Sequence, residues 1–384
     1  MNQSLVEELI SVANTFGANP EYSRAGGGNA SVKFDGILHI KPSGVSLATL
    51  AATDLVPLRI EVLLEALRSD EPVEGDPVRA AAEKAQVGDA GVRRPSVEIL
   101  FHALIPDALV LHTHPLVANA LTCNTDAEAL LEQLLGDEAV LVPYTDPGVP
   151  LAREVERVRN VYTARTGRPA PGITLLGNHG IIVSGNSAAE LTERAERLTA
   201  TIAAAIDSTP APVAEVADGA ALTELVNVVA PTLRGLLGSS ERLAEVTSDC
   251  SDLVRSVTTS PAGTALLSGG PLIPDQIVYA GSLPLVLTLS KGADLAVQVT
   301  EAVSAYRELH GKDPIISVVP GVVAFGAGAD LAAAQTALAT FTDALRVARD
   351  ANRIGTVRCL DATQRAFIEN WEAESYRKAV AAGA

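Results

Sequence analysis

The sequence predicts an α/β protein with two domains, because its length, its apolar composition and an internal repeat all favour that architecture. A chain of 384 residues is long enough for two domains with full cores. Its hydrophobic fraction is 47% while its aromatic fraction is only 3%, so Ala, Val, Leu and Ile must build the cores. We expect a first domain over 1–207, a linker over 208–219 that contains Pro210 and Pro212, and a second domain over 220–384.

The first helix and the first hairpin have clear local signals. Ser4-Leu5-Val6-Glu7 is a capping-box pattern, and the apolar residues that follow it at helical spacing predict a helix over 4–16. Farther along, Asp35-Gly36 joins the short apolar runs 31–34 and 37–40, which predicts a β-hairpin.

Three more helices are predicted in the first domain. One opens at Pro95-Ser96, and the other two cover about 151–165 and 188–206. After the linker, an alanine-rich helix resumes near Ala221.

The charge and the cysteines of the chain restrict its partners and its compartment. A net charge of −17 argues against sequence-independent binding to nucleic acid or to anionic membranes, both of which require basic patches. Three widely spaced cysteines imply no disulfide framework, which fits a reducing compartment. The N-terminus lacks a signal-peptide layout, and no uncharged apolar run is long enough to span a membrane. We therefore expect a cytoplasmic protein that binds neither nucleic acid nor membranes.

The motif His112-Thr113-His114 carries the strongest functional signal. It ends the apolar run 108–111, and because a strand alternates its side chains, both imidazoles project from the same face. A third histidine, His179, stands between the apolar runs 173–176 and 181–183, so half of the 6 histidines lie at these two places. Three neutral imidazoles leave open positions on a divalent ion, which is the arrangement of a catalytic metal site. The alternative interpretation is three strand-end histidines that are satisfied by hydrogen bonds.

Three turn segments are candidates for an anion site. The backbone N–H groups of Gly26–Ser31 could cradle a phosphate, and Lys41-Pro42-Ser43-Gly44 supplies a cation, a hydroxyl and a free amide at another turn. Ser96 is expected in the first turn of the helix that Pro95 opens, where the helix dipole attracts negative charge. Ordinary turns are the alternative interpretation of the first two segments.

Glu98 follows Ser96 in the same predicted turn and is the candidate base, because metal-assisted chemistry at carbon needs a base beside the ion. The alternative is that this carboxylate only caps the helix. His102, one helical turn later, is interpreted as a core residue or an i,i+4 partner rather than as a metal ligand.

An internal repeat suggests that the second domain is a degenerate copy of the first. Residues 105–117 resemble 273–286, and 173–183 resemble 316–324. The second copy would lack the metal ligands, because this alignment replaces them one by one: His112 by Ala280, His114 by Ser282 and His179 by Pro320. Chance resemblance between buried strand–turn–helix segments is the alternative.

Taken in order, five short motifs resemble those of the class II aldolase/adducin family: GGGNAS, KPSG, PSVE, HTHP and NHG. Within that family, the sequence is most similar to sugar-phosphate aldolases, such as L-fuculose-phosphate aldolase and the aldolase part of bifunctional rhamnulose-phosphate aldolase/alcohol dehydrogenases. The resemblance covers about 1–205 and implies a class II aldolase-like, three-layer α/β/α domain with a central mixed sheet. The remaining chain more loosely resembles the segment that follows the aldolase motifs in the bifunctional proteins, which implies a second, degenerate aldolase-like α/β domain. No GxGxxG motif follows a strand, so we expect no dehydrogenase part.

The resemblance also implies roles for individual residues. His112, His114 and His179 match the ligands of zinc or of another divalent cation such as cobalt or manganese. Glu98 matches the catalytic acid/base. The positions that hold the substrate's phosphate in the family match Gly28, Asn29, Ser43, Gly44 and Ser96.

Two features depart from the family pattern. Val97 stands where the fuculose-phosphate enzymes have a second phosphate-binding serine. Residues 116–143 contain no aromatic side chain to match the tyrosine proton donor of the neighbouring subunit, for which Tyr144 is a substitute.

The function that the resemblance implies is divalent-metal-dependent retro-aldol cleavage of a ketose phosphate or a related sugar-derived substrate, through a metal-bound enediolate. Glu98 would transfer the proton at the carbon. The same scaffold supports 4-epimerisation of a pentulose phosphate and decarboxylation of a 3-oxo sugar-acid phosphate, and both stay open as alternatives. A non-catalytic scaffold, as in adducin head domains, is a further alternative. Family members are typically rings of four, so we expect a homo-oligomer whose small-molecule partner is a sugar phosphate or a sugar acid.

Overall fold

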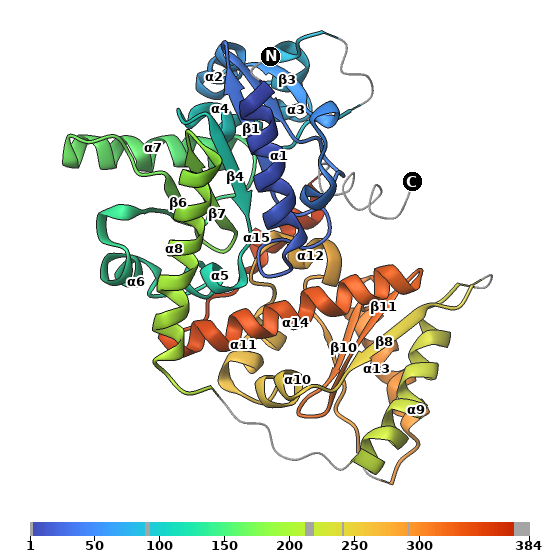
Figure 1. Cartoon of the computed structure of the whole chain (residues 1–384). Coiled ribbons are helices and arrows are strands. Elements are labelled where there is room, and N and C mark those ends of the chain that lie inside the picture. The colour runs from blue at the N-terminus through green and yellow to red at the C-terminus, as the bar shows by residue number, and fades with distance from the viewer. Residues whose placement is uncertain (1–2, 89–92, 212–218, 240–241, 291, 372–384) are drawn as a thin grey trace. The chain divides into compact units, whose positions relative to one another are not determined.

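The chain folds into two compact units, each built around a sheet of its own (Figure 1). The computed structural model describes residues 3–88, 93–211, 219–239, 242–290 and 292–371. The first unit comprises Met1–Thr122, Asp126–Ser208 and Asn370–Ala384, and the second comprises Cys123–Thr125 and Thr209–Glu369. None of the described helices is both long and apolar enough to cross a lipid bilayer.

The sheet of the first unit has seven strands in the order β3-β2-β1-β4-β7-β6-β5. In chain order they are β1 (Asn29–Phe34), β2 (Ile37–Ile40), β3 (Val56–Arg59), β4 (Leu109–Thr113), β5 (Val140–Val142), β6 (Ile173–Leu176) and β7 (Gly180–Gly185). The edge strand β5 runs parallel to β6, and all other neighbouring pairs are antiparallel. The expected central mixed sheet is confirmed.

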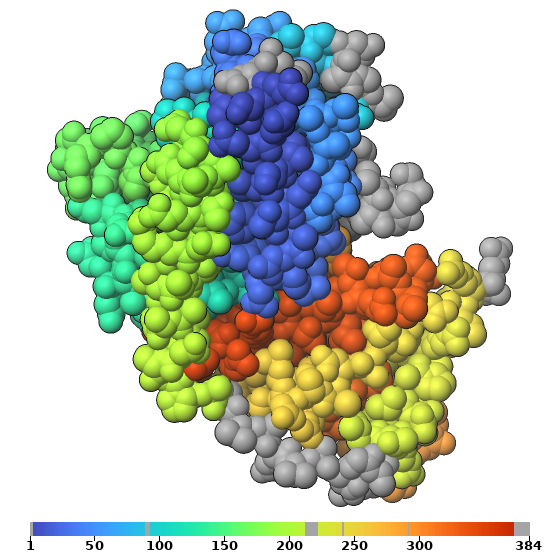
Figure 2. Space-filling view, viewed as in Figure 1, coloured from blue at the N-terminus to red at the C-terminus, as the bar shows by residue number. Residues whose placement is uncertain are grey.

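Helices cover both faces of this sheet. On one face, a hydrophobic cluster joins buried strand residues to α2 (Ile60–Arg68), α3 (Pro77–Ala85), α4 (Ile99–Leu104) and α7 (Val149–Thr166). On the other face lie α1 (Gln3–Ala18), α5 (Leu116–Thr122) and α8 (Ala188–Asp207), and Figure 2 shows α1 and α8 side by side. Short elements complete the unit: α6 (Ala127–Leu134) and the 3-10 helices η1 (Leu47–Thr49), η2 (Ala52–Asp54) and η3 (Gly136–Glu138). The expected three-layer α/β/α architecture is therefore confirmed.

Most of the predicted elements of the first unit are confirmed. Helix α1 matches the helix expected over 4–16, and α7 and α8 match those expected at about 151–165 and 188–206. In the β1–β2 hairpin the two turn residues, Asp35 and Gly36, have left-handed φ angles of 51° and 75°. A two-residue hairpin turn requires such angles at both positions, which Asp-Gly tolerates.

The helix that was expected to open at Pro95-Ser96 begins later. Helix α4 starts at Ile99, with Glu98 as its N-cap residue. The Ser96 hydroxyl accepts the N–H of Glu98 at 3.2 Å, so a side-chain-stabilised turn precedes the helix. The expectation that Ser96 and Glu98 lie in the first helical turn is wrong, although both stand immediately before it.

The second unit contains a four-stranded sheet in the order β8-β11-β10-β9. Its strands are β8 (Glu245–Asp249), β9 (Leu285–Val286), β10 (Ile316–Val319) and β11 (Val323–Gly328). One face shares a hydrophobic cluster with α9 (Gly219–Leu236) and α13 (Leu295–His310), and the long helix α14 (Leu331–Ile354) packs on β8 and β11. Shorter helices complete the unit: α10 (Asp252–Val257), α11 (Pro261–Gly269), α12 (Pro274–Ala280) and α15 (Ala362–Asn370).

The second sheet repeats part of the first. The order β8-β11-β10-β9 has the same relative strand directions as β4-β7-β6-β5. The two hairpins share their register, because the pairs Leu176–Gly180 and Val319–Val323 close equivalent turns. Each turn contains one residue with a left-handed φ, Asn178 at 49° and Gly321 at 78°. The expected second α/β domain is confirmed, and its described part has no counterpart of β1, β2 and β3.

The residue correspondence expected between the two copies is wrong in detail. The segment aligned with β4 forms helix α12 instead, with Pro274 at a first helical position, where proline is favoured. The strand that takes the place of β4 is β8, in which Ser248 faces Phe325 as His112 faces Ile182. Ala280, Ser282 and Pro320 are therefore not the counterparts of the three histidines. The shared register instead matches them as follows: His112 with Ser248, His114 with Cys250 and His179 with Val322.

Candidate metal centre

The topology of the first sheet brings the predicted functional segments to one edge. Strands β4, β5 and β6 point the same way, so their carboxyl ends share an edge, where β1 begins and β2 ends. The segments at this edge are Gly28-Asn29, Lys41–Gly44, His112–His114, Pro143–Asp146 and Gly177–His179. Motifs that are far apart in the sequence thus become neighbours.

His112, His114 and His179 converge at this edge. One ring nitrogen of each lies within 4.8 Å of those of the other two, and the described residues contain no second group of this kind. The Nε2 atoms of His112 and His114 are 3.0 Å apart. Two nitrogen ligands of a tetrahedral zinc ion, each about 2.0–2.1 Å from the metal, are separated by roughly 3.3 Å. The three histidines could therefore hold a divalent metal ion.

The hydrogen bonding of His112 fits a ligand role. Its side chain is fully buried, and its Nδ1 lies 2.8 Å from the carbonyl oxygen of Ile181, which can only accept a hydrogen bond. Nδ1 therefore carries the hydrogen, which makes Nε2 the ring nitrogen that could coordinate a metal ion. A backbone carbonyl on the second nitrogen is a common way to fix the orientation of a ligating histidine.

The Glu98 carboxylate lies beside the histidines. Its Oε1 is 3.4 Å from Nε2 of His112 and 3.4 Å from Nε2 of His179. Its Oε2 accepts a hydrogen bond from the side-chain amide of Asn29, the residue that pairs with His112 across β1 and β4. Glu98 is buried, so this carboxylate is directed inwards and is not on an exposed helix end. The structure thus brings together five of the predicted site residues: the three histidines, Glu98 and Asn29.

Two glycines allow the strands to approach one another at the site. Gly28 has a φ of +80°, and a Cβ there would lie 2.7 Å from the backbone oxygen of His112. At Gly180 a Cβ would lie 2.5 Å from Cδ2 of His114 and 2.5 Å from the backbone oxygen of Thr113. Any side chain at either position would push β4 and its histidines out of place.

Replacing Gly180 by alanine is therefore expected to weaken metal binding. The added methyl group must displace either the His114 ring or the Thr113 carbonyl, and the affinity for Zn²⁺ should fall by about 10–100-fold, as when a group that orients a ligand is lost. Competition with a chromophoric chelator measures this affinity. The control is Gly235→Ala in α9, where the new Cβ meets nothing within 4 Å. Equal affinity for Gly180→Ala and the wild type would contradict the argument.

Three of the predicted phosphate-binding residues, Ser43, Gly44 and Ser96, lie in two loops that touch. The backbone N–H of Ser43 donates to the Arg94 carbonyl at 2.8 Å, and its hydroxyl donates to the Pro95 carbonyl at 3.2 Å. Gly44 follows with a φ of +84°. Ser96 is buried, and its hydroxyl accepts the N–H of Glu98, which links this loop pair to the carboxylate.

Lys41, at the end of β2, is almost completely buried. Its relative exposure is 1%, and its ammonium donates to the carbonyls of Val45 at 2.7 Å and of Pro42 at 3.4 Å. The side chain therefore brings a positive charge beneath the loop that contains Ser43. Sequence reasoning identified this lysine as a cation but not as a buried one.

Tyr144, Arg93 and Arg94 lie in loops, and each of them contacts an aspartate. The Tyr144 hydroxyl donates to Asp146 at 3.2 Å in the loop after β5. Arg94 forms an ion pair with Asp76 at 3.1 Å, and Arg93 pairs with Asp54.

Sequence reasoning missed the side chains of Ser31 and Lys33, which follow Asn29 at every second position of β1 and share its face.

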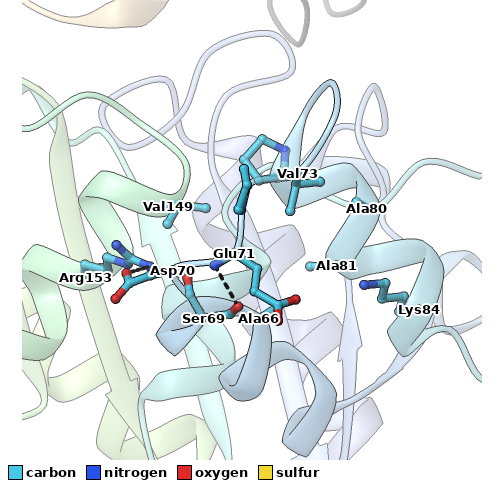
Figure 3. A pocket seen from close by; sticks show the side chains of 12 residues that line it. Ala66, Ser69, Asp70, Glu71, Val73, Ala80, Ala81, Lys84, Val149 and Arg153 are labelled. Atoms are coloured by element: carbon cyan, nitrogen blue, oxygen red, sulfur yellow. Dashed lines mark hydrogen bonds and ion pairs between the residues drawn. The ribbon is translucent and has the colours of Figure 1, made fainter.

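A surface pocket of about 480 Å³ lies elsewhere in the first unit (Figure 3). It is lined by residues of α2 and α3, of the loop between them and of the first turns of α7. Arg153 at its wall pairs with Asp70 at 3.1 Å. None of the residues that line this pocket belongs to the predicted site.

Two family models match the chain. Residues 7–206 match the Class II Aldolase and Adducin N-terminal domain, and residues 224–377 match the Aldolase class II, second domain. Among curated proteins, the Uncharacterized oxidoreductase YuxG of Bacillus subtilis (strain 168) is 24% identical over 416 aligned positions, with 98% of this chain and 58% of that protein covered. The chain thus spans little more than half the length of this relative.

Solved structures match about half of the chain. The N-terminal class II aldolase domain of a conserved protein from Thermoplasma acidophilum has 24% identity and a TM-score of 0.46, and the match covers 52% of this chain and 92% of that one. L-fuculose-1-phosphate aldolase from Thermus thermophilus has 21% identity and a TM-score of 0.35, with 54% and 95% of the two chains covered.

Proposed function

Because this chain belongs to the class II aldolase and adducin family, we propose that it is a divalent-metal-dependent carbon–carbon lyase. Its substrate would be a ketose phosphate or a related sugar-derived compound, cleaved by a retro-aldol reaction. The observation that carries the proposal is the Glu98 carboxylate, 3.4 Å from Nε2 of both His112 and His179. Proton transfer at carbon beside a metal ion needs an acid/base group in this position.

The histidines and Glu98 divide the work in this proposal. His112, His114 and His179 hold the ion, which when bound polarises the carbonyl and hydroxyl oxygens of the substrate and stabilises the negative charge that develops there. In the cleavage direction, the hydroxyl on the departing fragment loses its proton to solvent and becomes a carbonyl, while the electron pair of the broken carbon–carbon bond passes to the carbon beside the original carbonyl. Glu98 in its protonated form would deliver a proton to that carbon, and its carboxylate would remove this proton in the reverse direction. A positioned acid/base of this kind contributes about 10²–10⁴-fold in rate.

Asn29 holds the carboxylate in place for this transfer. Its amide donates to Oε2 of Glu98, so Oε1 remains directed towards the histidines. Because Asn29 pairs with His112 in the sheet, the base and a metal ligand share one rigid support.

The anionic end of the substrate would bind to the loops beside Glu98. Gly28, Ser43, Gly44 and Ser96 are our proposal for the residues that hold it, together with Asn29. The contact between the Ser43 and Pro95 loops supports this assignment, as does the buried ammonium of Lys41 beneath them. Val97 supplies no hydroxyl, so fewer donors surround the anion than in the fuculose-phosphate enzymes.

Zinc is our proposal for the native ion, because three neutral imidazoles in a buried site suit it. Cobalt and manganese are the alternatives. Elemental analysis of the protein purified without added metal should give about one equivalent of ion per chain. A non-catalytic scaffold needs no stoichiometric metal, so a metal-free protein that does not take up zinc would support that interpretation instead.

Product analysis tests the reaction itself. The metal-loaded protein is incubated with ketose phosphates and with 3-oxo sugar-acid phosphates, and the products are identified by NMR. Two carbonyl fragments are the expected result. An epimer or carbon dioxide would overturn the retro-aldol assignment and leave the metal centre intact. The homo-oligomer that the family resemblance implies stays a prediction, which a mass measurement in solution checks.

A further inference from the structure

The face of β1 that packs towards α4 is polar where a hydrophobic core would be expected. Asn29, Ser31 and Lys33 stand at alternate positions of the strand and therefore share this face. Asn29 donates to Glu98. The Ser31 hydroxyl lies 2.7 Å from Nδ1 of His102, and the Lys33 amine donates to the His102 carbonyl at 2.8 Å. Three successive polar contacts thus join this strand to the segment 98–102, beginning beside the metal centre.

The contact made by Lys33 takes the place of a backbone hydrogen bond that a proline cannot make. A helical carbonyl normally accepts the N–H of the fourth following residue, and for His102 that residue is Pro106, which has none. The last turn of α4 therefore leaves the His102 carbonyl without a backbone donor. The Lys33 amine supplies the missing hydrogen bond, as basic side chains do at helix C-termini.

His102 is a polar side chain in a site that an apolar one could fill. Its ring is completely buried, and this burial is the largest of the effects that hold its pKa well below the usual range, so the imidazole is neutral. Its Nε2 has no hydrogen-bond partner among the described residues. The ring stacks on Phe101 at 4.9 Å, and Phe101 meets the His112 ring edge-on at 5.6 Å. Burying these two nitrogens costs stability that a leucine would not cost, which points to a role other than stability.

We propose that Ser31, Lys33 and His102, named here the support residues, position the Glu98 carboxylate against the metal centre. This inference rests on the proposed role of Glu98. Helix α4 has only six residues, which is too short to be stable by itself, so its direction depends on such anchors. Glu98 is its N-cap residue, and His102 lies one turn later, in its last turn. A tilt of the helix at His102 would therefore move the carboxylate at Glu98.

The titration of Lys33 provides one test of this buried contact. Burial lowers the pKa of Lys33 to about 7; the Asp107 carboxylate opposes this shift, and the Arg159 guanidinium adds to it. Between pH 7 and the ordinary value of 10.5, the unfolded chain therefore binds more protons at this residue than the folded chain. The free energy of unfolding should rise with pH over that range. In Lys33→Met this rise should be smaller, as followed by urea midpoints at several pH values; equal slopes would contradict a buried amine.

The main experiment measures proton transfer separately from metal binding. The full-length, zinc-loaded protein is given dihydroxyacetone phosphate in D₂O, and exchange of the carbon-bound proton is followed by ¹H NMR. For His102→Leu we expect the maximal exchange rate to fall by about tenfold, part of the 10²–10⁴-fold that a positioned base contributes. The half-saturating ligand concentration and the zinc affinity should stay unchanged. His102→Asn should restore most of the rate, because its carboxamide oxygen can take the place of Nδ1 opposite Ser31.

The matched control removes a buried hydrogen bond in which none of the support residues takes part. Thr174→Val, in β6, deletes the hydrogen bond between the Thr174 hydroxyl and Arg159 of α7. Arg159 keeps its hydrogen bond to the Pro171 carbonyl. Its exchange rate should equal that of the wild type. If His102→Leu also exchanges at the wild-type rate while Glu98→Gln does not, the support role is overturned and the role of Glu98 stands. If Glu98→Gln exchanges normally, the proposed function fails.

A crystal structure of His102→Leu gives a second measurement that needs no substrate. We expect the Glu98 carboxylate to leave its position 3.4 Å from His112 and His179. An unmoved carboxylate in a folded variant would overturn the proposal even if dihydroxyacetone phosphate is not a ligand.

Discussion

Glu98→Gln should lower the rate of turnover by about 10²–10⁴-fold and leave the fold and the metal affinity intact. The change replaces a carboxylate with an amide of the same shape, which cannot accept and return a proton at the substrate carbon. The amide oxygen can still accept the hydrogen bond from Asn29, so the side chain should keep its place. The loss should therefore appear in the maximal rate and not in the half-saturating substrate concentration.

Three measurements separate this result from general damage. Thermal unfolding and zinc affinity should match the wild type, and exchange of the carbon-bound proton with D₂O should be lost together with turnover. Glu83→Gln is the matched control, because Glu83 is exposed on α3 and forms an ion pair with Arg79 of the same helix. A Glu98→Gln variant that turns over its substrate at full rate would remove this carboxylate from the mechanism.

Much of the fold and the metal site follows from local sequence patterns. The spacing of apolar residues after Ser4, the Asp35-Gly36 turn and the helical spacing near 188–206 each specify one element without help from distant residues. The predicted capping box is wrong in detail, because α1 begins at Gln3 and Ser4 lies inside the helix. The histidines at the ends of two apolar runs were predictable for a similar reason. Strand alternation places His112 and His114 on one face, and the common direction of β4 and β6 brings His179 to the same edge.

The errors arise where tertiary context overrides a local pattern. The dipeptide Pro95-Ser96 is a good helix start, yet the Ser96 hydroxyl stabilises a turn and delays α4 to Ile99. The segment at Pro274 resembles the one that contains β4, yet it forms helix α12. Strand β4 is held by its pairing with β1 and β7, and this long-range pairing cannot be seen in the local sequence. Only the register of the sheets identifies Ser248 as the counterpart of His112.

The support residues show a different limit of sequence reasoning. Polar residues at alternate positions of β1 are normally interpreted as the solvent face of a half-buried strand. In this protein that face is covered by α4, and Ser31 is completely buried. The sequence holds the alternation but not the information about which face is covered, since that depends on how seven strands and their helices are layered.

His179→Ala should lower the affinity for Zn²⁺ by more than the roughly 10–100-fold that is typical when a partner of a metal ligand is lost. His179 supplies one of three nitrogens, and a site with two imidazoles binds a divalent ion far more weakly. The chain offers its own control, because Val322 occupies the equivalent turn position in the second unit. Val322→Ala truncates a side chain at the equivalent place of the β10–β11 hairpin and removes no metal ligand, so its zinc affinity should equal that of the wild type. Chelator competition on both variants gives the comparison, and turnover should be lost only in His179→Ala. If the two variants bind zinc equally well, the three histidines do not form the metal centre, and the lyase proposal loses the ion on which its chemistry depends.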